Sequence, residues 1–135
     1  ELPPLEIYAG GSVAVGTGLE AQRNMARPQV ALYVGGMGAK EKNFYNQIFR
    51  KYGFEEEAEI IQELYLSGRK GEAERVVPQE YIDSTSLIGD ESFIKDRLQV
   101  YQEAGVTCLS ARFLGKTIEE RVKHCDALRN IIEKI

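Results

Sequence analysis

The residues best placed to contact a ligand surround a short glycine-rich turn, Gly35-Gly36-Met37-Gly38. Three glycines in four residues allow positive φ angles and a close approach between the backbone and a neighbouring group. Tyr33 and Tyr45 flank the turn and, with Met37, could form one wall of a pocket for a flat ligand with polar edges. The alternative is that the turn only ends one helix and connects it to the next.

Other side chains capable of chemistry stand alone in the sequence. His124 is the single histidine, and with Cys125 beside it lacks further metal ligands, so we expect a structural role and no metal site. Arg112 has the planar fork that binds phosphate or carboxylate, but a surface ion pair with a glutamate is the expected use. Glu41 stands where a dinucleotide-binding glycine motif needs its third glycine. The catalytic residues are therefore unassigned.

Composition restricts the class of protein. The 135 residues, with 43% apolar and 28% charged side chains, are typical of one globular domain. A net charge of −4 argues against binding to nucleic acid or to an anionic membrane. Two cysteines without a CxxC motif, and no signal peptide or membrane span, predict a reduced, cytoplasmic protein. The chain starts at Glu1 without a methionine, which is consistent with a piece of a longer protein.

Hydrophobic patterns predict two strands separated by helices. Residues 5–15 alternate as a strand, and Gly10-Gly11 suggests a bulge or a close backbone approach. The capping box Thr17–Glu20 predicts a helix to about Arg27, with Pro28 opening a new turn or marking a kink. Residues 29–34 are expected to be helical, although VALYV would serve equally as a strand.

The rest of the chain is predicted to be mostly helical. Three helices are expected at 43–52, from Glu55 to Gly68, and at 71–77. A fourth is expected at 78–88, although a strand is also possible over that range. A fifth is expected at 90–104. Residues 106–113 form the second predicted strand. Residues 117–135 form the closing helix, with an apolar stripe of Ile118, Val122, Cys125, Leu128, Ile132 and Ile135. In the helix predicted at 43–52, one face carries Phe44, Ile48, Phe49 and Tyr52.

Two strands alone make a marginal sheet with unpaired edges. The connection between them far exceeds the dozen or so residues of an ordinary parallel crossover, so it must contain a helical insert. The apolar residues on both faces of the second strand imply neighbours on each side. We therefore expect the last strands of a larger parallel barrel or sheet, and self-association into a homo-oligomer through the open strand edges.

Four segments in order carry a family resemblance: ALYVGGMGAKEKNFYNQIFRKYGF, AEIIQELYLSGRKGEA, VPQEYIDSTSLIGD and LQVYQEAGVTCL. They resemble the C-terminal part of the luciferase-like monooxygenase superfamily, in the branch of oxidoreductases that use coenzyme F420. The resemblance implies the α/β class and one partial domain, 1–135, from the end of a (β/α)8 TIM barrel. Strand 5–15 would be the seventh and strand 106–113 the eighth, with a helical insert at 17–89, helix 90–104 and closing helix 117–135.

The same resemblance implies hydride transfer to or from a small organic substrate by a deazaflavin enzyme. FMN is the alternative cofactor, in a monooxygenase of the same superfamily, and a noncatalytic helical interaction domain is the alternative from another class. A complete barrel needs about 250 residues, so we expect the 135 residues alone to be inactive. In the family the insert helps to close the pocket, so the implied cofactor- or substrate-binding residues are Tyr33, Gly35, Gly36, Met37, Gly38, Asn43 and Tyr45.

Overall fold

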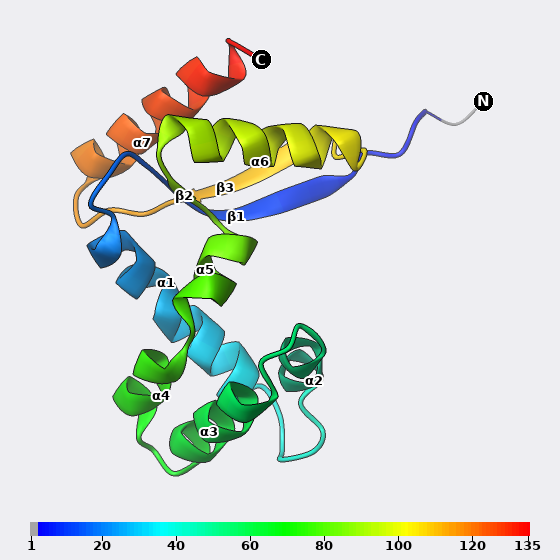
Figure 1. Ribbon diagram of the computed structural model, residues 1–135, viewed down its shortest axis with the longest axis vertical. Helices are drawn as coiled ribbons and strands as arrows, with labels where there is room; N and C mark the ends of the chain where they lie inside the picture. Colours follow the sequence, from blue (N-terminus) through cyan, green and yellow to red (C-terminus); the bar gives the residue numbers. More distant parts are fainter. Residues whose placement is uncertain (1–2) are drawn as a thin grey trace. The chain divides into compact units, whose positions relative to one another are not determined.

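The structure is a computed structural model that describes residues 3–135 (Figure 1). It divides into two compact units that are connected twice along the chain. The sheet unit comprises the described part of residues 1–22 together with residues 83–135, and the helical unit comprises Arg23–Ile82. The helical unit lies within the insert predicted at 17–89.

The sheet unit contains three parallel strands in the order β2-β1-β3. Strand β1 (Tyr8–Val15) pairs over six residues with β3 (Cys108–Phe113), which confirms the two predicted strands and their parallel direction. A third strand, β2 (Leu87–Gly89), pairs with residues 13–15 of β1. Residues 78–88 were expected to be helical with a strand as the alternative, and their end takes the strand. Leu87 and Ile88 are fully buried there, because a short apolar segment gains more from the edge of β1 than from a further helical turn.

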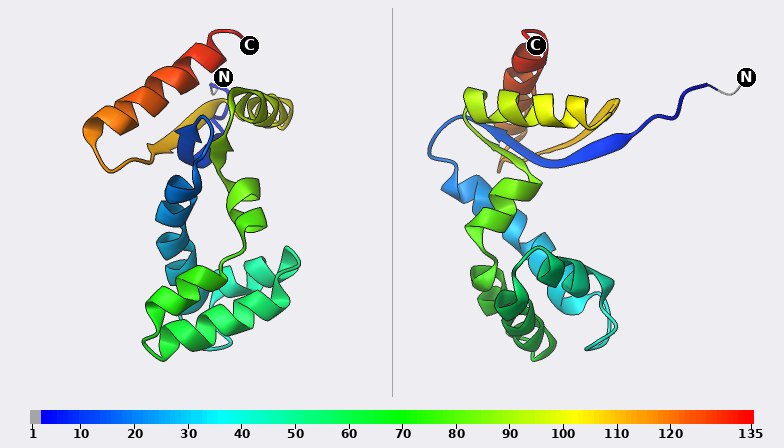
Figure 2. Two further views of the ribbon diagram at one scale, coloured as in Figure 1. Left: turned by 60° about the vertical axis from the view of Figure 1, so that its left-hand side comes forward. Right: turned by 45° about the vertical axis from the view of Figure 1, so that its right-hand side comes forward.

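Two helices lie on the same face of this sheet (Figures 1 and 2). Helix α6 (Glu91–Glu103) is capped by the Asp90 side chain, as predicted, and α7 (Ile118–Ile132) is capped by Thr117. The core beneath them is apolar and consists of Val13, Leu87, Ile94, Leu128 and Ile131, with Leu109, Ala111 and Phe113 partly buried around it. Parallel strands covered by helices are the packing expected for a piece of barrel wall.

The predicted stripe of α7 is largely wrong. The buried residues of α7 are His124, Leu128 and Ile131, whereas Cys125 is exposed. Other apolar members of the predicted stripe are also exposed, namely Ile118, Val122, Ile132 and Ile135. Apolar residues lie on several sides of this helix, so its periodicity alone does not show which side faces the sheet.

The first helix also differs from its predicted start. Helix α1 (Glu20–Ala31) begins three residues after the proposed Thr17 cap, because Gly18 has a φ of +66° and interrupts helical geometry. Pro28 lies inside α1, and a short π-helix, η1 (Leu32–Gly36), follows directly. The helical assignment of residues 29–34 is therefore confirmed.

The rest of the helical unit consists of α2 (Phe44–Lys51), α3 (Glu55–Leu66), α4 (Lys70–Val76) and the start of α5 (Gln79–Thr85). Phe49 is fully buried against the rings of Phe54 and Tyr81, at centroid distances of 5.2 and 4.5 Å. Burial in this cluster raises the pKa of the Tyr81 phenol. Phe44 and Tyr52, predicted on the same face as Phe49, are instead exposed.

The expected close backbone approach is found at Gly10. Its φ is +141°, and a Cβ atom added there would lie 2.0 Å from the carbonyl oxygen of Ser110 on β3. A side chain at this position cannot coexist with the observed register, in which Gly10 pairs with Ser110. The β1–β3 ladder therefore depends on a glycine at this point.

We predict that Gly10→Ala lowers the free energy of unfolding by at least about 2 kcal/mol, because it combines a steric clash with strained backbone. The matched control is Gly71→Ala in α4, where an added Cβ atom meets nothing within 4 Å. This control is expected to be neutral or slightly stabilising. The stabilities of the two variants are compared by urea unfolding, with circular dichroism as the signal. Equal midpoint urea concentrations for the two variants would contradict the close contact between Gly10 and Ser110.

Candidate functional site

The glycines of the candidate turn allow a tyrosine ring to pack against the backbone. A Cβ atom at Gly35 would lie 2.5 Å from the Tyr65 Cβ, and one at Gly36 would lie 2.4 Å from the Tyr65 Cε1. Gly38 has a φ of +156°, and a Cβ there would lie 3.2 Å from the Lys42 carbonyl oxygen. The three glycines thus have a packing and conformational role in shaping the turn.

Asn43 holds the turn to the start of α2. Its side chain is 1% exposed, and its amide nitrogen donates hydrogen bonds to the carbonyl oxygens of Tyr33 and Val34, at 2.9 and 3.0 Å. Its Oδ1 accepts the backbone N–H of Asn46, which is the predicted N-cap bond. Both donors of the Asn43 amide are therefore used within the protein, and this residue positions the turn.

Asn46 continues this network and was missed by the sequence analysis. Its Nδ2 donates to the carbonyl oxygens of Val34 and Ala58, at 3.0 and 2.8 Å, and its Oδ1 accepts from the Arg50 guanidinium at 2.9 Å. The last carbonyls of a helix have no partner within the helix, and the two asparagines donate to those of Tyr33 and Val34 near the end of η1. An asparagine three residues after a helix cap is the only sequence signal that would have pointed to it.

An aromatic wall stands beside the turn. The Tyr33 and Tyr45 rings meet edge to face with their centroids 4.7 Å apart, and the Phe44 ring lies 5.7 Å from that of Tyr45. Tyr45 and Met37 are 41% and 47% exposed, so both can be contacted from solution. The structure thus places all seven candidate residues along one short segment, with exposed rings suited to stacking and no acid–base pair.

The carboxyl ends of β1 and β3 form a second area of interest, since barrel chemistry lies at these ends. Arg112 Nη2 donates to Ser12 Oγ at 2.7 Å, and no carboxylate pairs with Arg112 in the described part of the chain. The prediction that Arg112 forms a surface ion pair is therefore wrong.

His124 Nδ1 accepts the backbone N–H of Val15 at 3.1 Å, which confirms the structural role predicted for this histidine.

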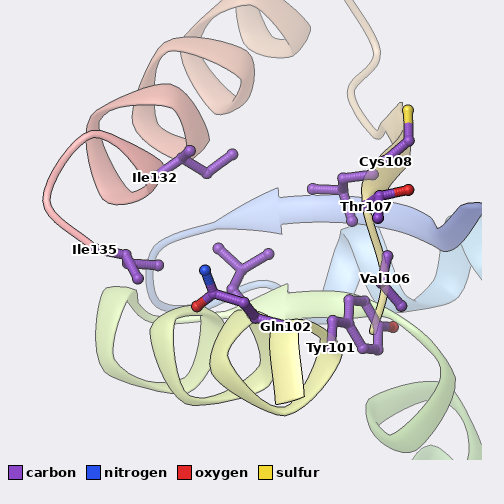
Figure 3. A pocket seen from close by; sticks show the side chains of 9 residues that line it. Tyr101, Gln102, Val106, Thr107, Cys108, Ile132 and Ile135 are labelled. Atoms are coloured by element: carbon purple, nitrogen blue, oxygen red, sulfur yellow. The ribbon is translucent and has the colours of Figure 1, made fainter. Parts of the chain in front are cut away.

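An apolar hollow of about 250 Å³ lies at the opposite, amino-terminal end of β3 (Figure 3). Side chains of Tyr101, Val106, Ile132 and Ile135 line it, together with Thr107 and Cys108 (Figure 3). In a barrel this end carries residues that stabilise the fold, and the chemistry lies at the other end. We therefore do not assign the hollow to the active site.

The side chains and helices of residues 3–135 also bear on metal binding and on membrane spanning. No group of three or more histidine, cysteine, aspartate or glutamate side chains in this range gathers as a metal site would require. Across the same range, no helix combines the length and apolar character needed to cross a membrane.

Comparison with known proteins identifies the family. The family profile described as "Luciferase-like monooxygenase" matches residues 1–108, so the chain belongs to the luciferase-like monooxygenase family. A Mycobacterium tuberculosis protein, provisionally named a coenzyme F420-dependent oxidoreductase, is 35% identical over 104 residues. That alignment covers 77% of this chain and 30% of the relative. No solved structure matches the chain.

We predict that Asn46→Leu destabilises the helical unit by about 3 kcal/mol, because two buried carbonyls and one guanidinium nitrogen lose their partner. The neighbouring Gln47→Leu is the control, since Gln47 is exposed and makes only a 3.4 Å bond to the Glu41 carbonyl. Urea unfolding measures the free energy of unfolding of both variants. A loss below about 0.5 kcal/mol for Asn46→Leu would show that the asparagine network does not hold the turn.

Proposed function

We propose that the chain is the C-terminal segment of an F420-dependent oxidoreductase that transfers a hydride to or from a small organic substrate. The observation that carries this proposal is the 35% identity to a relative named for coenzyme F420, within a matched luciferase-like family. The chain spans 30% of the length of that relative, so the activity belongs to a longer protein. FMN is the competing cofactor, in the alternative that the longer protein is an FMN-dependent luciferase-like monooxygenase of the same family.

In this proposal the helical unit contributes one wall of the pocket for the cofactor or substrate. The exposed Tyr45 ring, held by its edge-to-face contact with Tyr33, would pack against the flat ligand. The glycine turn and Asn43 would fix the position of that ring. The deazaflavin would supply the hydride chemistry, and these side chains would supply shape and orientation.

The test is a chimaera in which this chain replaces the matching segment of the Mycobacterium tuberculosis relative. We expect the chimaera to turn over F420, followed by the cofactor's visible absorbance, and the isolated 135 residues to show no turnover. Turnover with FMN and none with F420 would reject the cofactor assignment. Turnover by the isolated chain would reject its role as a segment of a larger catalytic unit.

A second comparison tests the aromatic wall within the same chimaera. Tyr45→Ala is expected to weaken cofactor or substrate binding about tenfold, because one stacking surface is lost. Tyr52→Ala is the matched control, since Tyr52 is an exposed tyrosine that caps the other end of α2. Equal binding constants for the two variants would remove Tyr45 from the pocket.

We also propose that the isolated chain self-associates through the sheet. Within residues 3–135, no strand pairs with the outer edge of β3, and unpaired parallel edges favour pairing with a second chain. Light scattering should show a mass that rises with protein concentration. A constant monomeric mass would reject edge-to-edge association.

A further inference from the structure

A polar hollow of about 310 Å³ lies between α2 and α3 in the helical unit. Two buried amides, Asn46 and Gln62, form part of its lining, and Arg50 and Glu59 lie beside them. A water molecule occupies about 30 Å³ in the liquid, so the hollow has room for a small organic molecule. Neither the family assignment nor the aromatic wall described above accounts for this space.

Gln62 is the unusual member of this lining. It is 4% exposed, and its Nε2 has no hydrogen-bond partner within the described residues. The nearby buried amides of Asn43 and Asn46, by contrast, use both of their donors. A buried amide without a partner is unfavourable, and an apolar residue would pack at this position of α3 without that cost. The unused amide therefore indicates a partner that is not part of the protein.

Arg50 supplies a charge next to this amide. Its Nε is fixed by Asn46 Oδ1 at 2.9 Å, while its two Nη atoms hold no hydrogen bond to any residue in the range 3–135. A guanidinium that is anchored at Nε presents its other nitrogens as a planar fork, which matches the two oxygens of a carboxylate. The half-buried position of Arg50 limits screening by solvent.

The charges around the hollow indicate how much negative charge the ligand carries. Lys40 and Arg50 are balanced by Glu41 and Glu59 in the lining, and Lys40 is also paired with Glu63 at 3.5 Å. A doubly charged anion would meet repulsion from the two glutamates, whereas a single carboxylate matches the one guanidinium that is free to bind. The lining thus favours a monoanion.

We propose that the hollow binds a small organic monocarboxylate. The Arg50 fork holds the two carboxylate oxygens, and the Gln62 amide, which can turn about its terminal bond, donates to one of them. This site lies wholly within the helical unit and does not depend on which cofactor the longer protein uses.

Acetate is the probe, titrated into the ¹⁵N-labelled 135-residue chain while the side-chain amide signals are followed by NMR. We expect a saturable shift of the Gln62 amide signal with a dissociation constant in the millimolar range. Acetamide, which has the same shape and no charge, should bind at least about tenfold more weakly. An equal response to acetamide, or no saturable response to acetate, would overturn the proposal.

Two variants and one control locate the site. Gln62→Leu should abolish acetate binding, measured by the shifts of backbone amide signals. The variant is expected to stay folded, because an apolar group of similar size replaces a buried donor that has no partner. Arg50→Lys loses the planar fork and should weaken binding about tenfold, whereas Arg69→Lys, at an exposed pair with Glu72, should not. Unchanged binding in Arg50→Lys would overturn the assignment even if Gln62→Leu failed to fold. Phosphate binding as tight as that of acetate would also overturn the carboxylate assignment.

Discussion

The parallel ladder between β1 and β3 is the interaction on which the sheet unit depends. It joins segments 100 positions apart, as the bond between the Ile7 backbone and the Thr107 hydroxyl shows. Contacts at such separation require a large loss of chain entropy before they form. Burial of Val13, Ile94 and Leu128 beneath α6 and α7 compensates this entropy loss. The ladder also requires a residue without a side chain at position 10, which Gly10 provides.

The helical unit is organised by buried amides as much as by apolar packing. Asn43 and Asn46 bind the carbonyls of the η1 turn and of α3, so the irregular backbone next to the glycines is held without a regular helix. Apolar packing at Phe49 and Tyr81 lies elsewhere in the unit. The buried amides thus fix the turn and the start of α2, where Phe44 and Tyr45 are exposed, while the apolar packing lies apart from them.

Local signals in the sequence predicted local structure well. The caps at Asn43, Asp90 and Thr117 are all present, since a side chain that bonds a backbone N–H three residues later acts within one helical turn. The capping box at Thr17 failed because Gly18 takes a left-handed conformation that no spacing rule reveals. Strand β2 was predicted only as the alternative to a helix, because three residues are too few to show alternation and its strand state depends on β1.

Properties set by tertiary contacts were harder to predict. On α7 the apolar stripe pointed to Cys125, whereas the buried polar residue is His124, which bonds the end of β1. On α3, Gln62 was one polar residue among many in a charged helix, and nothing in the sequence marked it as buried. Of the two amides that hold the candidate turn, Asn43 was predicted as a helix cap, whereas the role of Asn46 became visible only in the packed structure.

The central claim is that β3 has one paired edge and one open edge, as the last strand of an incomplete barrel wall would. Cys108 and Leu114 donate their backbone N–H groups toward β1, so by alternation Ser110 and Arg112 do the same, while Leu109 and Ala111 point to the open edge. Amide hydrogen exchange, measured by NMR on dilute, monomeric chain, tests this directly. The account predicts slow exchange at Ser110 and Arg112 and much faster exchange at Leu109 and Ala111. Equal, strong protection at all four amides would show that both edges are paired and would contradict it.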